Sequence, residues 1–320
     1  MMNNIDLFSG IGGFSYAMHG KIRTIAYCDI DTNCRNTLKC IMSKGLIDTA
    51  HVFEDVKTLN ASSFSETPHM ITGGFPCQDI SSANPNGAGL DGDRSSLFFE
   101  IIRLCDEIPS IRHVFLENVD RILKRGMIDR VEKEFHDRGF NVEYVIITAK
   151  QMGAPHRRRR CYILATKDVS ELSHITLPWE DSWLSGPETM VPIPSPEYPR
   201  EVRNRCGMCG NSVVPACVSA AFNHLVSRIP LPDQTRLLLG FRVSDGNVSY
   251  NRTSWGTPYA CKERYNRYLS ITQRSRTVLY NQVYYDTRNE DKRDGNWTIN
   301  PNFVEWLMGY PLDYTLNTLQ

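Results

Sequence analysis

Short apolar segments alternate with amphipathic ones along the first half of the chain. The apolar segments are typical of strands, which we expect near 5–8, 23–28, 50–53, 69–73, 112–117, 142–148 and 160–166. The segments between them have a helical pattern, and we expect helices near 13–20, 31–44, 95–107 and 120–138. Strands and helices that alternate at these lengths predict an α/β fold built on a doubly wound, mostly parallel sheet.

The pattern changes after residue 166. Residues 167–206 are Pro-rich, and we interpret them as an irregular connector. An Ala- and Val-rich segment near 214–227 predicts one more helix, whereas 231–299 has no clear period. We therefore expect a smaller, irregular second domain at 231–299. The larger domain would comprise 1–166 and 207–230, together with 300–320.

Charge and cysteine content restrict the classes of protein to which this chain can belong. The 320 residues include 36 basic and 36 acidic ones, so the net charge gives no indication of a polyanionic partner. Residues 231–299 hold eleven basic and seven acidic residues among many aromatic ones, which is typical of a nucleic-acid surface. No apolar run predicts a membrane span and no signal peptide begins the chain. The ten scattered cysteines indicate a reduced, intracellular protein that is not secreted.

Three of the predicted strands end in residues suited to an adenosine-containing cofactor. The first strand leads into the Gly-rich turn Phe8–Gly13, where the backbone can approach a ligand closely. Asp29 ends the second strand, where a carboxylate can accept hydrogen bonds from ribose hydroxyls. Asp55 and Val56 follow the third strand, near the expected position of an adenine. No GxxxxGK[ST] motif is present, which argues against a P-loop ATPase.

A Pro-Cys pair at the end of the fourth strand is the strongest indication of chemistry. Cys77 lies in Gly73–Gln78, and 81–96 is a Gly- and Ser-rich loop that could close over a site. Most cysteines are packed and inert, so a buried sulfur is the alternative. Glu117 ends a neighbouring apolar strand, and Arg158 and Arg160 begin another. Two residues apart on a strand, these arginines would point to one face.

These motifs together resemble the cytosine-5 DNA methyltransferase family. The resemblance covers most of 5–166 in the family's order, and the matching segments are DLFSGIGGF (6–14), GGFPCQDIS (73–81), RSSLFFEI (94–101), ENV (117–119), QMGAPHRRRRCYILA (151–165) and GNSVVPA (210–216). It implies a Rossmann-like methyltransferase that uses S-adenosylmethionine and flips a cytosine out of double-stranded DNA. It leaves room for a companion restriction endonuclease and implies no metal ion. A monomer would suit this task.

The resemblance also implies a role for each matching residue. Cys77 would be the nucleophile, and Glu117, Arg158 and Arg160 would hold the target base. The cofactor residues would be Phe8, Gly10, Ile11, Gly12, Gly13, Asp29, Ile30, Asp55, Val56, Pro76, Leu97, Asn211 and Ser212.

The chain departs from the family's order at its C-terminal end. GNSVVPA precedes 231–299, which is therefore predicted to be the inserted target-recognition region, and His156 stands where Gln is usual. The final segment 300–311 is similar to the family's RLQGFP element, or is simply a packing helix followed by a turn. Three other functions stay open: an RNA cytosine-5 methyltransferase, a catalytically silent DNA-binding relative, and a redox or zinc protein that uses Cys206 and Cys209.

Overall fold

The computed structural model describes residues 1–76, 97–123, 126–154, 156–179, 193–194, 200–227, 297–298, 301–311 and 313–316. Cys77, the 81–96 loop and most of 231–299 lie outside these described residues. The chain divides into two units. The sheet unit comprises Met1–Ile147, Arg159–Trp179 and Cys217–Leu231, and the second unit comprises Thr148–Arg158, Glu180–Ala216 and Pro232–Gln320.

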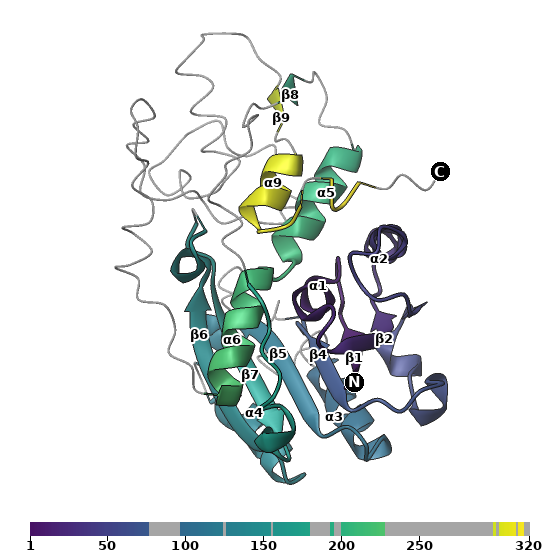
Figure 1. Cartoon of the computed structure of the whole chain (residues 1–320), viewed down its shortest axis with the longest axis vertical. Coiled ribbons are helices and arrows are strands. Elements are labelled where there is room, and N and C mark those ends of the chain that lie inside the picture. Colours follow the sequence, from purple (N-terminus) through teal and green to yellow (C-terminus); the bar gives the residue numbers. More distant parts are fainter. Residues whose placement is uncertain are drawn as a thin grey trace. The chain divides into compact units, whose positions relative to one another are not determined.

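A seven-stranded sheet forms the centre of the sheet unit, in the order β3-β2-β1-β4-β5-β7-β6 (Figure 1). The pairs β1–β2, β1–β4, β2–β3 and β4–β5 are parallel, and β7 runs antiparallel to β5. The doubly wound, mostly parallel sheet predicted from the sequence is confirmed. Its strands are β1 (Asn3–Leu7), β2 (Arg23–Cys28), β3 (His51–Phe53), β4 (Met70–Gly73), β5 (His113–Val119), β6 (Asn141–Thr148) and β7 (Arg159–Thr166).

The helices follow the predicted segments with two differences. The described helices are α1 (Gly13–Met18), α2 (Thr32–Ser43), α3 (Phe98–Glu107), α4 (Met127–His136), α5 (Arg200–Asn211), α6 (Pro215–Ser227) and α9 (Pro301–Leu307). The helix predicted at 120–138 is shorter, because a separate 3₁₀ turn covers Asp120–Leu123. The connector predicted over 167–206 is also only partly irregular, since α5 begins at Arg200.

The units group the C-terminal segments differently from the predicted domains. We expected residues 207–216 and 300–320 to belong to the larger domain that contains the sheet, but they fall in the second unit. That unit also contains the short antiparallel pair of β8 (Ile193–Pro194) and β9 (Trp297–Thr298). The helix α6 begins in the second unit, and its residues from Cys217 onward belong to the sheet unit.

The core of the sheet unit is packed with large aromatic and aliphatic side chains. Phe98 lies at its centre, with ring centroids 5.4 Å from Phe75 and 5.8 Å from Phe135. Such edge-on and tilted ring contacts are the arrangements that aromatic quadrupoles favour. Cys28, Cys34 and Cys40 are buried, and the eight cysteines among the described residues are all free.

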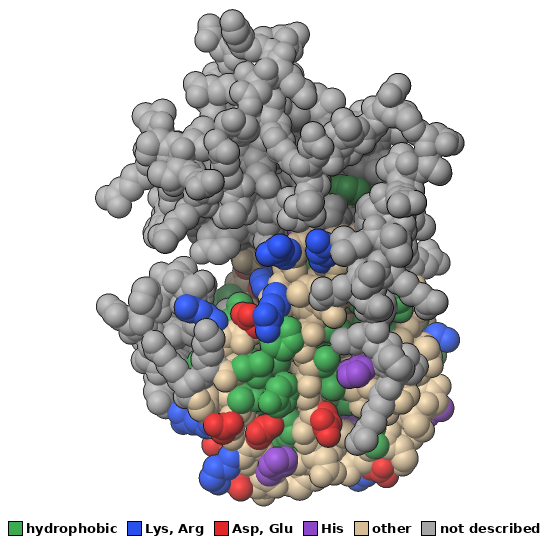
Figure 2. All heavy atoms as spheres, turned by 90° about the vertical axis from the view of Figure 1, so that its left-hand side faces the viewer, with side chains coloured by type: hydrophobic (Ala, Val, Ile, Leu, Met, Phe, Trp, Pro, Cys, Tyr) green, Lys and Arg blue, Asp and Glu red, His purple; other side chains and the backbone are tan. Residues whose placement is uncertain are grey.

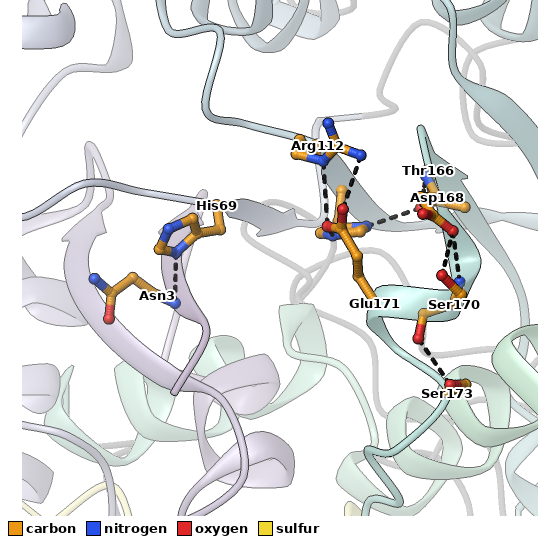
Figure 3. Close-up of polar contacts among 9 residues, drawn as sticks. Asn3, His69, Arg112, Thr166, Asp168, Ser170, Glu171 and Ser173 are labelled. Atoms are coloured by element: carbon orange, nitrogen blue, oxygen red, sulfur yellow. Dashed lines mark hydrogen bonds and ion pairs between the residues drawn. The ribbon is translucent and has the colours of Figure 1, made fainter.

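A group of polar contacts joins the ends of β1, β4, β5 and β7 that are remote from the predicted site (Figure 3). His113 bonds through Nδ1 to Thr166 Oγ1 at 2.8 Å and through Nε2 to Glu171 Oε2 at 2.9 Å. Arg112 Nη2 lies 2.8 Å from Glu171 Oε1. Burial lowers the pKa of His113, so the buried ring favours its neutral form. These contacts stabilise that edge of the sheet without any role in the predicted chemistry.

The edge strand β6 borders an apolar surface. Figure 2 shows this side of the molecule, where hydrophobic side chains gather above several acidic ones. Tyr144 on β6 is 42% exposed. Glu143, next to it on the strand, is exposed, and a charge on an edge strand disfavours pairing with another chain. Among the described helices, none has the length and hydropathy needed to cross a lipid bilayer.

Candidate active site

The turn after β1 has an unusual backbone. Phe8 and Gly10 have φ values of 52° and 54°, and Gly12 has a φ of 75° where it precedes α1. Left-handed φ values suit glycine, whereas a phenylalanine there carries strain. A side chain on Gly12 would in addition lie 3.0 Å from Leu38. The sequence DLFSGIGGF therefore specifies a tightly curved turn with an aromatic residue held in it.

The predicted acidic partner of this turn lies in direct contact with it. The Gly10 amide donates to Asp29 Oδ2 at 2.7 Å, and the Asp31 amide donates to Asp29 Oδ1 at 2.8 Å. Burial raises the pKa of the Asp29 carboxyl, and the two amide hydrogen bonds offset only part of this rise. Ile30, the next residue, is 74% exposed. A fixed carboxylate beside an exposed apolar side chain fits a ribose next to an adenine.

The remaining predicted cofactor residues of the sheet unit follow the carboxyl ends of parallel strands or begin α3. The Asp29 amide donates to Phe53 O at 3.2 Å, which joins the ends of β2 and β3. Asp55 accepts from the Lys57 amide at 3.0 Å, and Val56 is buried. Ile11 and Gly13 are buried, whereas Pro76 and Leu97 are half-buried.

Sequence reasoning missed a buried carboxyl group beneath the turn. Asp6 is fully buried in β1 and accepts hydrogen bonds from Ser15 Oγ at 2.8 Å and Thr72 Oγ1 at 3.0 Å. Burial raises its pKa to about 7. The available signal was an aspartate between the apolar residues Ile5 and Leu7. These contacts hold β1, α1 and β4 together directly below the turn.

The predicted catalytic residues of the sheet unit meet at the carboxyl ends of β4 and β5. Arg160 Nε lies 2.7 Å from Glu117 Oε1. A Cβ atom on Gly74 would lie 3.2 Å from Glu117 Oε2, so Gly74 passes directly beside that carboxylate. Asn118 Nδ2 donates to Phe75 O at 3.3 Å. The backbone that leads to Cys77 is therefore held against Glu117, while Cys77 itself lies outside the described residues.

The other predicted arginine has different partners. Arg158 belongs to the second unit and is 4% exposed. Its guanidinium donates to Gly210 O at 3.0 Å and to Ser212 O at 2.5 Å. Ser212 Oγ donates to Cys209 O at 2.8 Å, and the neighbouring Asn211 is exposed. The structure thus joins Arg158 to the GNSVVP segment, a contact that the sequence did not predict.

Cys209 has the properties of a packed thiol, whereas Cys206 is half-buried. Burial raises the pKa of Cys209 well above its ordinary value, which disfavours the thiolate needed for redox or zinc chemistry. In the part of the chain that the structure describes, no three Cys, His or acidic residues are arranged to hold a metal ion.

Comparison with known proteins gives one family. A sequence model described as C-5 cytosine-specific DNA methylase matches residues 2–318. The Type II methyltransferase M.CviJI of Paramecium bursaria Chlorella virus IL3A is 32% identical over 229 residues, which cover 69% of this chain and 58% of that protein. M.Sau3AI of Staphylococcus aureus, also a Type II methyltransferase, is 32% identical over 179 residues, covering 51% of this chain and 43% of that one. The chain thus spans about half the length of these relatives.

Among solved structures, the chain resembles a DNA modification methyltransferase encoded within an E. coli prophage. The TM-score is 0.46 with 24% sequence identity, and the match covers 62% of this chain and 59% of that one.

Proposed function

The chain belongs to the C-5 cytosine-specific DNA methylase family, and on that premise we propose that it transfers a methyl group from S-adenosylmethionine to carbon 5 of cytosine in duplex DNA. The observation that carries this proposal is the Glu117–Arg160 pair. It lies beside Gly74, three residues before Cys77, at the carboxyl ends of two parallel strands. Open α/β sheets place their ligand sites at this edge.

The described residues fit the cofactor. The Phe8–Gly13 turn approaches the end of β2 closely, and Asp29 holds a carboxylate there through two backbone amides. Ile30 offers an exposed apolar surface beside it. S-adenosylmethionine would supply the methyl group, while Asp29 would bind its ribose and Asp55 and Val56 would lie at its adenine. The other cofactor residues given by the sequence remain predictions on the same basis.

The proposed chemistry begins with Cys77. Its thiolate adds to carbon 6 of the cytosine ring, which makes carbon 5 nucleophilic enough to accept a methyl group. Negative charge then develops across the ring. Glu117 would contact ring N3 and hold a proton there, and Arg160 would face ring O2. Methyl transfer to carbon 5 would leave S-adenosylhomocysteine, after which a base removes the carbon 5 proton, the Cys77 sulfur leaves as thiolate and the aromatic ring is restored.

The target base must leave the duplex before Cys77 can reach it, at a cost of about a few kcal/mol. We propose that the 81–96 loop closes behind the base and that 231–299 reads the DNA sequence. The excess of basic residues and the many aromatic ones in 231–299 support this assignment. We also propose that the enzyme is intracellular and monomeric, with or without a companion restriction endonuclease.

A covalent trapping experiment tests the function. Bisulfite sequencing of DNA from a host that expresses the chain would first identify the modified cytosines and their sequence context. A duplex with 5-fluorocytosine at that position lacks the removable proton, so the Cys77 adduct should persist. We expect a stable protein–DNA adduct with the wild-type chain and none with Cys77→Ala, which should still bind S-adenosylhomocysteine.

Parallel assays on tRNA and duplex DNA separate the alternative functions. Methylation of tRNA without methylation of duplex DNA would identify an RNA cytosine-5 methyltransferase. DNA binding with neither methylation nor adduct would identify a catalytically silent relative. Methyl transfer that survived Cys77→Ala would rule out the covalent mechanism.

A further inference from the structure

The turn between α5 and α6 has its carbonyl groups fixed by side chains. The end of a helix leaves carbonyl groups without backbone partners. Here Gly210 O and Ser212 O accept from Arg158, and Val213 O accepts from the Tyr310 hydroxyl at 2.9 Å. Three of the four residues of the Gly210–Val213 turn are therefore held through their main chain. Asn211, whose side chain is predicted to contact the cofactor, lies between the two carbonyls that Arg158 holds.

Arg158 has the geometry of a helix C-terminal cap. A cation is favoured at this end of a helix because the carbonyl dipoles point towards it. The planar guanidinium presents its N–H groups in a fixed fork, which suits two acceptors two residues apart. Both terminal nitrogens of Arg158 are used in this way within the second unit. Those contacts argue against a primary role at the target base.

The chain reversal at the end of α9 sets the position of Tyr310. Gly309 has a φ of 78°, and the Gly309 amide donates to Trp306 O while the Tyr310 amide donates to Glu305 O, both at 2.9 Å. These are the two hydrogen bonds of a Schellman motif, in which a left-handed glycine reverses the chain after a helix. Figure 1 shows α9 beside α5. The reversal brings the buried Tyr310 back towards Val213.

The segment 301–316 is also fastened to the rest of the second unit by contacts that do not involve the turn. His156 Nε2 bonds to Leu307 O at 2.8 Å. Arg205 Nη2 donates to the fully buried Glu305 at 2.9 Å, and the Thr315 amide donates to the same Glu305 oxygen at 2.9 Å. Loss of the Tyr310 hydroxyl should therefore loosen the turn without releasing the segment.

We propose that Arg158 and Tyr310 are positioning residues, which hold the Gly210–Val213 turn so that Asn211 can contact the cofactor. This assignment rests on the proposed function, because it takes Asn211 as a cofactor contact. Arg158 then acts through the turn on cofactor affinity, whether or not DNA is bound. A residue that grips only the target base would leave that affinity unchanged in the absence of DNA.

Isothermal titration of the full chain with S-adenosylhomocysteine, without DNA, tests the proposal. We expect Tyr310→Phe to raise the Kd about fivefold and Arg158→Met to raise it about tenfold or more, in line with the loss of one and two hydrogen bonds. Thr315→Val is the control within the same unit, because it removes a buried hydroxyl that donates to Glu305 and accepts from Arg205 but holds no carbonyl group of the turn. It should lower the melting temperature at least as much as Tyr310→Phe, because two hydrogen bonds are lost, and leave the Kd within about twofold.

Four results bear on the proposal. A rise in Kd for Tyr310→Phe and not for Thr315→Val supports it, and this comparison is sufficient if Arg158→Met does not fold. Equal effects of Tyr310→Phe and Thr315→Val on the Kd would overturn it, since the contacts would then only stabilise the unit. Wild-type affinity in Arg158→Met combined with lost methyl transfer would return Arg158 to the target base. A wild-type chain that fails to bind S-adenosylhomocysteine would instead refute the proposed function itself.

Discussion

Arg160 and Glu117 form an ion pair across two antiparallel strands, with Arg160 Nε 2.7 Å from Glu117 Oε1. In the β5–β7 ladder Val119 faces Arg160 and Glu117 faces Tyr162, so the pair runs diagonally between neighbouring positions. The side chains are only 21% and 12% exposed. Glu117 is thus oriented by the protein itself, and under the proposed mechanism this would meet the condition for effective electrostatic stabilisation of developing charge.

Replacement of Glu117 by Gln should slow methyl transfer by about two to three orders of magnitude, because an amide cannot act as an acid towards ring N3 of the base. The affinity for S-adenosylhomocysteine should not change. Rates of transfer of a labelled methyl group and titration calorimetry measure the two effects. Glu143→Gln on the exposed face of β6 is the control. A parallel loss of cofactor affinity would show that Glu117 acts through the fold.

Replacement of Asp29 by Asn should weaken the binding of S-adenosylhomocysteine by about tenfold to a hundredfold, since charge-assisted hydrogen bonds contribute about 1.5–3 kcal/mol. The amide would also place an N–H group near the Gly10 or Asp31 amide, both of which donate to Asp29. Asp168→Asn is the matched control, because that carboxylate also accepts a backbone amide, from Ser170 at 2.9 Å, at the end of the sheet remote from the site. Equal Kd values for the two variants would exclude Asp29 from the cofactor site.

Two glycine-to-alanine changes should affect stability in opposite directions. A Cβ atom at Gly73 would lie 2.5 Å from Leu7 O, so Gly73→Ala must push β1 and β4 apart and should cost about 1–3 kcal/mol. At Gly207 in α5, no atom of the described residues lies within 4 Å of the new methyl group, apart from the adjoining residues and the backbone of the helix itself. Gly207→Ala should therefore stabilise the chain by up to about 1 kcal/mol. Urea unfolding of both variants measures the difference, and a stable Gly73→Ala variant would contradict the close approach.

The buried Asp6 should make stability fall as the pH rises towards neutrality. Its pKa in the folded chain, about 7, lies above the ordinary value of 3.8, so the folded state binds the proton more tightly between these values. The stabilisation is complete below about pH 4 and is lost as the pH approaches 7.

Asp6→Asn should remove that dependence. The amide has no proton to lose, and it can accept from Thr72 while donating to Ser15. Relative to wild type, the variant should gain up to a few kcal/mol between pH 5 and pH 8, at about 1.4 kcal/mol per pKa unit. Urea unfolding at the two pH values measures this, with the exposed Asp129→Asn as control. Parallel pH profiles for wild type and Asp6→Asn would show that Asp6 is ionised in the fold.

Local pattern was sufficient to predict most of the sheet. Apolar strands such as 69–73 and 160–166 were found within a few residues of β4 and β7, because a strand buried on both faces is apolar throughout. The antiparallel direction of β7 was not predictable, since it depends on pairing with β5 rather than on the strand's own residues. The start of α5 at Arg200 was missed because prolines precede it closely.

The candidate site also has contacts that the sequence could predict and contacts that it could not. Asp29 and the Phe8–Gly13 turn follow consecutive strands of one βαβ unit, so their contact could be inferred from spacing alone. The family resemblance assigned Glu117 and Arg160 to the same target base, but their contact with each other was not predicted, because the two residues are far apart in the sequence. The Arg158 and Tyr310 contacts to the Gly210–Val213 turn were not predicted, since they are hydrogen bonds to main-chain carbonyls that any sequence would offer.

The left-handed backbone of Phe8 has a consequence for laboratory evolution. A phenylalanine at a φ of 52° costs about 1–2 kcal/mol compared with a residue that tolerates this conformation. A library selected only for heat tolerance should therefore enrich glycine or asparagine at position 8, whereas selection for methylated DNA should restore the aromatic ring. The conflict between the two selections would locate the ligand surface experimentally, without a bound ligand and without any alignment.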